Sequence, residues 1–541
     1  MFALLLAATL AAGPEVTIQP DGDSLLARYE LTESVTTFEF APYDTPQRTD
    51  AWSPLDDGWR FDGATMSRTD GAEFSQFTLR MAPDPRHHDR RNIVVSRIGE
   101  GWALFLAALG GMGEPATVRF NGFTPDSRLS LAGHDGGISK SIRTDGNDRR
   151  AVYIGPMADG NQRTDDVPIV FIASPALPGW AKVALYENAV AIAQLLEKRL
   201  GTPTATRPLV LVVYDPSLTT NSTKGSALAG ATIQLNLSAL PADASDDAVG
   251  RLGGLIAHEM VHLWLNEVWD TAENAAQPWL HEGAAEYLAD RWLRSDQAFK
   301  REAENHLANC LSSLGSRPLD GSEGPLYGQI PYNCGFSLHL AAELAGLSNN
   351  HGDVLDLWRT ILDRSVERRY DSKLFLAVAA ERGGSAFTDF ATPLLRVQGG
   401  LKPLMLGKAL HGLGLEVVSR APNRDQGFAL MQSALRAIGR HYCRGAHGWW
   451  TQSDHLRMDT GDRCGPFLPG DPLVSTVNGI GLTSQPFDAY LELRKTCDAG
   501  APLTFATTDG EKLPSFDCEA TISEPVPFAR LNAMENLTEL R

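Results

Sequence analysis

The feature that most constrains this chain is a His-Glu-x-x-His motif at positions 258–262, inside an apolar run that begins at Leu255. The run contains no Gly or Pro, which favours a helix. Residues four apart share one face of a helix, so His258 and His262 can each direct an imidazole at the same ion. Glu259 lies one step round the helix, close enough to hold a water on that ion without binding the ion itself. The motif therefore predicts a helix that carries two metal ligands and a base.

A second stretch, from Trp279 to Tyr287, supplies a third candidate ligand, Glu282. Three protein ligands and one open position are typical of a hydrolytic zinc site rather than a structural one. Glu286 lies one helical turn further along the same face and is predicted to accept the free N–H of a ligand histidine. The alternative for Glu286 is an ordinary solvated glutamate. His281 projects about 100° away from Glu282 and is left outside the predicted site.

These two stretches resemble the motifs of gluzincin zinc metallopeptidases, and within them aminopeptidase N-like and glycyl aminopeptidase-like enzymes, whose second motif is Trp-Leu-x-Glu-Gly-x-Ala. The resemblance implies that His258, His262 and Glu282 hold one zinc ion and that Glu259 is the catalytic base. Aminopeptidase N-like enzymes usually place eighteen residues between the second histidine and the glutamate. Here nineteen residues intervene, from 263 to 281, so the match is to the clan more than to that branch.

The resemblance extends to a tyrosine and fails at one expected motif. Tyr332 opens a predicted helix fifty residues after Glu282, where such enzymes carry a tyrosine that donates a hydrogen bond to the oxyanion. Tyr327 is the rival candidate, and a tyrosine merely packed at a helix start is the structural alternative. Aminopeptidase N-like enzymes also carry a Gly-x-Met-Glu-Asn stretch that captures the substrate's amino group. Residues 225–231 stand in its place and contain no carboxylate, which puts cleavage from the N-terminus in doubt.

Changes of pattern along the chain predict a multidomain α+β protein. Residues 1–12 resemble a signal peptide, although no Lys or Arg precedes the apolar run. Short alternating runs in residues 13–167 predict an all-β domain. Residues 168–425 are predicted to form a thermolysin-like α/β catalytic domain with a helical extension. Within it, the alternation from Ala231 to Leu237 predicts a half-exposed edge strand, suited to main-chain pairing with an extended peptide.

The last part, residues 426–541, is predicted to return to short strands and turns. Leu468 to Gly479 resembles the Pro-Gly-Asp…Val-Asn-Gly segment of bacterial PDZ domains, which glycyl aminopeptidase-like proteins often carry after the peptidase. This resemblance implies a PDZ-like domain and a C-terminal peptide as its ligand. Residues 445–450 lie where a carboxylate-binding loop would be expected. A structural cap without a peptide ligand is the alternative.

Cysteines and charge constrain the compartment and the partners. The six cysteines fall into neighbouring pairs, which predicts three disulfides in an exported, periplasmic or secreted protein. Six buried free thiols are the alternative. The pairs are Cys310 with Cys334, Cys443 with Cys464, and Cys497 with Cys518. The net charge of −18 argues against nucleic acid as a partner, and no run beyond the N-terminus is long and apolar enough for a transmembrane anchor.

The sequence thus predicts an exported zinc metallopeptidase that hydrolyses peptide bonds, aminopeptidase-like in its motifs. An endopeptidase of the same clan is one alternative. Two others belong to different classes: a peptide-binding scaffold with a vestigial zinc site, and a zinc hydrolase acting on a non-peptide substrate.

Overall fold

The computed structural model describes most of the chain, which forms two compact units, 1–270 and 271–541. The described residues are 13–42, 45–83, 94–112, 115–132, 134–137, 141–144, 150–156, 169–201, 207–218, 222–228, 231–267, 277–314, 318–322, 326, 328–366, 369–396, 403–418, 420–444, 448–452, 455–459, 464, 472–522, 524 and 528–531. The predicted signal peptide, residues 1–12, and the rival Tyr327 lie outside them.

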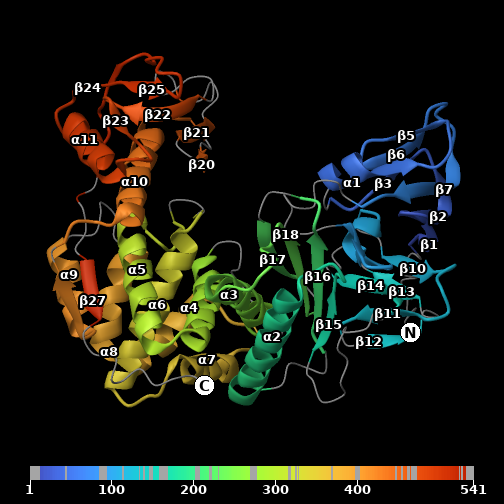
Figure 1. Cartoon of the computed structure of the whole chain (residues 1–541), viewed down its shortest axis with the longest axis horizontal. Helices are drawn as coiled ribbons and strands as arrows, with labels where there is room; N and C mark the ends of the chain where they lie inside the picture. The colour runs from blue at the N-terminus through green and yellow to red at the C-terminus, as the bar shows by residue number, and fades with distance from the viewer. Residues whose placement is uncertain are drawn as a thin grey trace, which may run out of the picture. The chain divides into compact units, whose positions relative to one another are not determined.

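The first unit begins with a β-rich region, as the alternating runs predict (Figure 1). Two sheets dominate it, one of six strands in the order β13-β10-β1-β2-β7-β4 and one of five in the order β12-β11-β14-β9-β8; β3, β6 and β5 form a smaller sheet. The strands are β1 (Glu15–Asp21), β2 (Ser24–Val35), β3 (Thr37–Glu39), β4 (Trp52–Pro54), β5 (Trp59–Phe61), β6 (Thr65–Arg68), β7 (Phe74–Met81), β8 (Val95–Ile98), β9 (Gly101–Phe105), β10 (Ala116–Phe120), β11 (Ser127–Leu131), β12 (His134–Gly137), β13 (Ile142–Thr144) and β14 (Ala151–Pro156). The region also holds a short helix, α1 (Thr45–Ala51), and a 3-10 turn, Leu106–Leu109.

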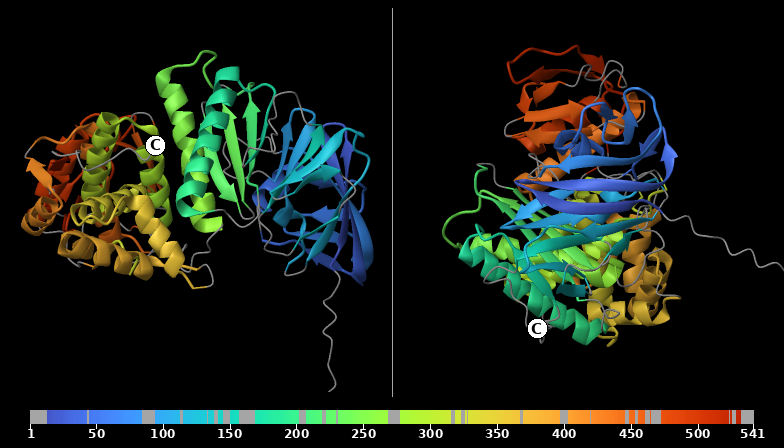
Figure 2. Two further views of the ribbon diagram at one scale, coloured as in Figure 1. Left: turned by 90° about the horizontal axis from the view of Figure 1, so that it is seen from below. Right: turned by 90° about the vertical axis from the view of Figure 1, so that its right-hand side faces the viewer.

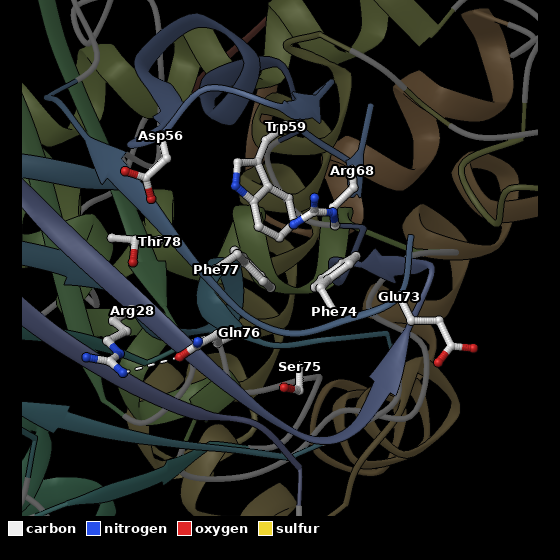
Figure 3. Close-up of a pocket in the computed structure, with 10 residues that line it drawn as sticks. All are labelled: Arg28, Asp56, Trp59, Arg68, Glu73, Phe74, Ser75, Gln76, Phe77 and Thr78. Atoms are coloured by element: carbon white, nitrogen blue, oxygen red, sulfur yellow. Dashed lines mark hydrogen bonds between the residues drawn. The ribbon is translucent and has the colours of Figure 1, made fainter. Parts of the chain in front are cut away.

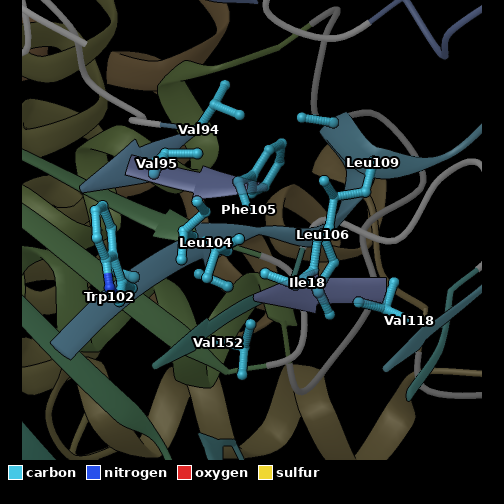
Figure 4. Packing of buried hydrophobic residues seen from close by; sticks show 14 of the residues in the cluster. Ile18, Val94, Val95, Trp102, Leu104, Phe105, Leu106, Leu109, Val118 and Val152 are labelled. Carbon is cyan, nitrogen blue, oxygen red and sulfur yellow. The ribbon is translucent and has the colours of Figure 1, made fainter. Parts of the chain in front are cut away.

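Apolar side chains from both large sheets form one core (Figure 4). Strand β1 alternates between buried and exposed side chains. Val16 and Ile18 are fully buried, while Glu15, Thr17 and Gln19 are partly or fully exposed. Aromatic rings add to this core: Tyr29 stacks on Phe77 with ring centroids 4.5 Å apart. Strand β10 alternates in the same way as β1, whereas β9 and β14 of the five-stranded sheet are buried on both faces.

A cavity of about 580 Å³ opens beside β7 (Figure 3). Trp59 and Phe74 give it an aromatic wall, and polar side chains such as Arg28 and Gln76 give the rest, with a 3.3 Å hydrogen bond from the former to the latter. None of the residues that line it belongs to the predicted metal site.

The α/β part of the first unit contains a four-stranded sheet in the order β15-β16-β18-β17. Its elements are β15 (Val170–Ala173), α2 (Gly179–Leu200), β16 (Leu209–Asp215), β17 (Ser222–Leu228), β18 (Thr232–Ser238) and α3 (Asp246–His262). Strands β15, β16 and β18 are parallel, and β17 pairs antiparallel with β18 as the edge. Helices α2 and α3 lie on one face of this sheet and the β-rich region on the other (Figures 1 and 2).

The prediction that residues 231–237 form the edge strand is wrong, because the neighbouring strand β17 is the edge. Strand β18 is buried along its whole length and lies between β16 and β17, so the edge is β17. The polar residues of β18 caused the error. Gln234 is in register with Leu211, which belongs to the core shared with the β-rich region, so Gln234 points towards that region rather than to solvent. Alternation along a strand distinguishes its two faces but not what covers each face.

The second unit starts with helices, in the part of the chain that is predicted to be a helical extension. They are α4 (Trp279–Leu293), α5 (Asp296–Leu314), α6 (Ile330–Ser348), α7 (Val354–Arg364), α8 (Ser372–Arg396) and α9 (Pro403–Gly412). Helix α8 continues through a kink at Gly384, whose φ of 57° a glycine adopts without strain. Among the helices that the structure describes, none is both long and apolar enough to cross a membrane.

Strands and two further helices complete the second unit. They are β19 (Leu415–Val418), α10 (Arg424–Tyr442), β20 (Gly448–Gln452), β21 (His455–Asp459), β22 (Leu473–Val477), β23 (Ile480–Gly481), α11 (Pro486–Asp498), β24 (Pro502–Leu503), β25 (Phe505–Thr507), β26 (Phe516–Asp517) and β27 (Phe528–Leu531). Strands β20 to β23 form a sheet in that order, with β25 also paired to β22. Asn478 and Gly479 form the tight turn between β22 and β23, and both residues have positive φ.

The long helix α10 was not predicted, because residues 426–541 were expected to return to short strands and turns. A signal for it exists in the sequence. Asn423 and Gln426 form a capping box, in which each side chain accepts a hydrogen bond from the other's backbone N–H. The segments 445–447 and 465–471, which include part of the PDZ-like motif, lie outside the described residues.

The predicted disulfides are confirmed. Neighbouring cysteines are bonded in all three pairs: Cys310–Cys334, Cys443–Cys464 and Cys497–Cys518. The first joins α5 to α6, and the other two lie in the C-terminal part of the unit. Disulfides are typical of oxidising compartments.

Candidate metal centre

Helix α3 forms where the sequence predicts it. The Ser245 side chain caps its start, accepting a 3.2 Å hydrogen bond from the Ala248 N–H, and two aspartates follow in the first turn. Further along, Ile256, Ala257 and Met260 are fully buried and fix the rotation of the helix. This packing leaves the motif residues on the remaining face.

The two motif histidines point at a common position. His258 Nε2 and His262 Nε2 lie 3.0 Å apart, and the rings are nearly perpendicular, with centroids 4.7 Å apart. His262 is only 8% exposed. Two imidazole nitrogens at this separation on a single helix face are the arrangement that the four-residue spacing predicts.

The end of α3 is anchored to the end of α2. The chain continues from His262 into one turn of π-helix, Leu263–Glu267, a feature that often marks functional sites. The buried Trp264 side chain in that turn donates a 3.2 Å hydrogen bond from Nε1 to the carbonyl of Gly201, the residue that ends α2. This anchor restrains the turn that bears His262.

Glu259 lies against the edge strand of the sheet. Its side chain is 7% exposed, and a Cβ atom placed on Gly225 would lie 2.6 Å from its carboxylate oxygen Oε1. Gly225 belongs to β17, in the segment that aligns with the missing Gly-x-Met-Glu-Asn stretch. The absence of a side chain at Gly225 therefore makes room for the predicted base, a role that the sequence comparison did not reveal.

We expect Gly225→Ala to displace the Glu259 carboxylate and to lower the turnover number about ten- to a hundredfold, because misplacement of a catalytic group by about 1 Å is enough for such a loss. The free energy of unfolding should change little, since β17 is an edge strand. Steady-state kinetics and thermal unfolding of the purified variant measure both.

Gly250→Ala on α3 is the matched control. A Cβ atom there meets nothing within 4 Å, so the substitution should keep the activity and stabilise the helix by about 0.5–1 kcal/mol. Full activity in Gly225→Ala would show that the base tolerates displacement or does not use this position.

In the second unit, Glu282 lies in the first turn of α4, and the residue after it forms a close helix contact. A Cβ atom on Gly283 would lie 2.2 Å from the Cα of Gly335 on α6, and one on Gly335 would lie 2.0 Å from the carbonyl oxygen of Trp279. The backbones of α4 and α6 therefore touch at this glycine pair. The contact places the turn that carries Glu282 beside the start of α6, where Tyr332 lies three residues before Gly335.

A buried polar cluster holds the same two helices together further along. The Tyr287 hydroxyl on α4 donates to the Glu343 carboxylate on α6, and Arg291 lies 3.8 Å from that carboxylate. Burial and the neighbouring Glu343 carboxylate raise the pKa of Tyr287 well above its ordinary value, so the phenol stays a donor. Together with the glycine contact, this cluster fixes α4 on α6 along their length.

The other residues of the predicted site, Glu286 and Tyr332, also belong to the second unit. Glu286 Oε1 lies 3.7 Å from His306 Nε2 on α5. Tyr332 is half-buried in the first turn of α6. His281 is buried, and its Nδ1 lies 3.3 Å from the Tyr370 hydroxyl. Sequence reasoning did not single out His306.

Comparison with known proteins gives one family match. Residues 178–309 match the family model described as BSP, peptidase of plants and bacteria, a stretch that contains α3 and α4 with their motifs. No curated protein matches the chain.

Among solved structures, the chain is similar to an M1 zinc metallopeptidase from Deinococcus radiodurans, in a mutant form bound to a Tyr-Ser-Ala substrate. The identity is 15% and the TM-score 0.40, over 73% of this chain and 95% of that one. It is also similar to a two-domain M1 zinc metallopeptidase bound to L-arginine, with 14% identity and a TM-score of 0.41, over 72% and 95% of the two chains. For yeast LTA4 hydrolase the identity is 11% and the TM-score 0.42, over 79% and 72%.

Proposed function

We propose that this chain is a zinc-dependent peptidase that uses His258, His262 and Glu282 as ligands of one zinc ion. The observation that carries the proposal is the 3.0 Å separation of the two histidine Nε2 atoms. Nitrogens bound at about 2.0–2.1 Å to one tetrahedral zinc ion lie roughly 3.3–3.4 Å apart, so little movement is needed to accept the ion. The match of residues 178–309 to a peptidase family supports the reaction class.

The donor set fits zinc. Two imidazoles and one carboxylate, with a fourth position left for water, are a common catalytic zinc set. Glu282 is proposed as the third ligand for its donor type and for the Trp279–Tyr287 motif that carries it. When bound, the ion supplies Lewis acidity and lowers the pKa of a water in the open position.

Three further side chains have distinct proposed roles. Glu259 accepts a proton from the attacking water and later gives it to the departing amine. The Tyr332 hydroxyl donates a hydrogen bond to the oxygen of the scissile carbonyl as negative charge develops there. Glu286 accepts the N–H of a ligand histidine through the oxygen that does not face His306, which keeps the ligand nitrogen unprotonated.

Strand β17 is proposed to bind the substrate. It is the edge of its sheet, so an extended peptide can pair with its main chain. Its seven residues, Ser222–Leu228, include Lys224 and no carboxylate. The motifs favour an aminopeptidase-like enzyme, but this lack of an acidic anchor for a substrate amino group favours an endopeptidase as the second candidate.

Mass spectrometry of the products from a mixed peptide pool tests this function. The zinc-loaded protein should hydrolyse peptides, and a chelator should abolish the hydrolysis until zinc is restored, because the proposed reaction needs the ion. A ladder of products shortened from the N-terminus identifies an aminopeptidase, and internal cuts identify an endopeptidase. Hydrolysis that persists without metal, or an intact peptide pool with zinc present, contradicts the proposal.

We further propose that the protein is exported and that its C-terminal part is a PDZ-like domain. Three disulfides support export. The sheet that contains β20 to β23 and β25, together with α11, supports a small domain that binds a C-terminal peptide. A structural cap is the alternative for this domain.

A further inference from the structure

Helix α5 contacts the first turn of α6 at two neighbouring positions. His306 Nδ1 lies 2.7 Å from the side-chain oxygen of Asn333, and one turn later Cys310 is bonded to Cys334. Asn333 and Cys334 directly follow Tyr332 in the sequence. The turn that presents the Tyr332 hydroxyl is therefore held by a hydrogen bond and by a covalent link, both from α5.

The other ring nitrogen of His306 faces α4. Its Nε2 lies 3.7 Å from Glu286 Oε1 and 3.8 Å from Asp290 Oδ2, and both carboxylates lie on the helix whose first turn bears Glu282. Arg294 also faces this group through a 2.7 Å hydrogen bond to Asp290 Oδ1. One imidazole thus connects the helix of a proposed zinc ligand with the turn of the proposed oxyanion donor.

Packing and charge fix this ring. It stacks on Phe336 of α6, with centroids 4.1 Å apart and planes 14° apart. Burial disfavours a charge on His306, but the nearby carboxylates of Asp290 and Glu286 outweigh it and raise the pKa of His306. An imidazolium ring donates from Nδ1 to the Asn333 side-chain oxygen and presents its positive charge to the two carboxylates on the other side.

We propose that His306 is a positioning residue, which holds the Tyr332 turn of α6 in register with the Glu282 turn of α4. This inference rests on the proposed function, in which both turns contribute to catalysis. A histidine that only fills the core would stabilise the unit without acting through Tyr332. The two roles differ in whether the effect of removing His306 depends on the Tyr332 hydroxyl.

A double-mutant cycle of His306→Phe and Tyr332→Phe tests this role. His306→Phe keeps an aromatic ring against Phe336 but removes both nitrogens. Alone it should lower the turnover number about ten- to a hundredfold with KM nearly unchanged, because a displaced hydroxyl weakens only the transition state. In the Tyr332→Phe background it should have almost no further effect, because it acts through that hydroxyl. Asn333→Ala, which removes the same contact from α6, should behave alike.

Hydrogen exchange provides a measurement that does not need activity. The amides of Asn333 and Cys334, in the first turn of α6, should exchange faster in His306→Phe, with or without zinc. The matched control is His339→Phe, the same change at a fully buried histidine whose Nδ1 lies 2.8 Å from the Gly335 carbonyl. It should lower the thermal unfolding midpoint while keeping the turnover number and the exchange of that first turn.

The outcomes separate this inference from the proposed function. If the wild-type protein hydrolyses no peptide, the proposed function fails, and exchange alone decides whether His306 holds the turn. If Tyr332→Phe is impaired but His306→Phe is fully active, or loses the same factor in both backgrounds, only the positioning role is overturned. Unchanged exchange of the Asn333 and Cys334 amides overturns it as well.

Discussion

Replacing Glu259 with Gln should lower peptide hydrolysis by a factor of about 10²–10⁴, the usual contribution of a general base. The amide is nearly isosteric with the carboxylate and cannot accept the proton from water. Because Glu259 is not a proposed ligand, the variant should bind zinc as the wild-type protein does. The turnover number, the zinc content and the thermal unfolding midpoint of the purified variant measure these effects.

Glu187→Gln is the control for this experiment, since it makes the same chemical change at an exposed position on the neighbouring helix α2. It should be fully active. Undiminished hydrolysis in Glu259→Gln would refute the mechanism proposed here. A wild-type protein that binds peptides without cutting them, with or without zinc, would instead favour the peptide-binding scaffold with a vestigial site.

Local signals in the sequence were sufficient to predict the helix that carries the motif. Ser245 before two aspartates marks the start of α3, and its apolar spacing sets the buried face, so the alignment of His258 with His262 follows from helix geometry alone. The cysteine pairs were predicted equally well, because close spacing along the chain favours neighbours. These features depend on residues within about one element of each other.

The features that the sequence did not predict depend on which distant part of the chain packs against a helix or strand. The polar residues of β18 indicated a solvated face, yet Gln234 is 1% exposed. Nothing in the spacing reveals that Gly283 meets Gly335 at a helix contact, because the two are far apart in sequence. His306 and Asn333 are 27 residues apart, and only the packing of α5 on α6 brings them together. Tertiary partners of this kind leave no local periodicity.

Replacing Tyr332 with Phe should lower the turnover number about 10²–10³-fold, the usual effect of losing one oxyanion donor, with KM nearly unchanged. The ring remains, so the packing of the first turn of α6 should persist and the thermal unfolding midpoint should move little. The hydroxyl matters only when the carbonyl oxygen gains charge, which is why the loss should appear in the turnover number. Steady-state kinetics on one peptide identified from the product analysis measures it.

Two further Tyr→Phe variants make this result decisive. Tyr186→Phe on α2, whose ring packs against Phe171, is the control and should be fully active. Tyr327→Phe tests the rival donor. If Tyr327→Phe loses activity and Tyr332→Phe does not, the oxyanion donor is Tyr327, and the glycine contact between α4 and α6 then serves only to carry Glu282. If Tyr332→Phe alone is impaired, that contact joins a zinc ligand and an oxyanion donor in one rigid helix pair.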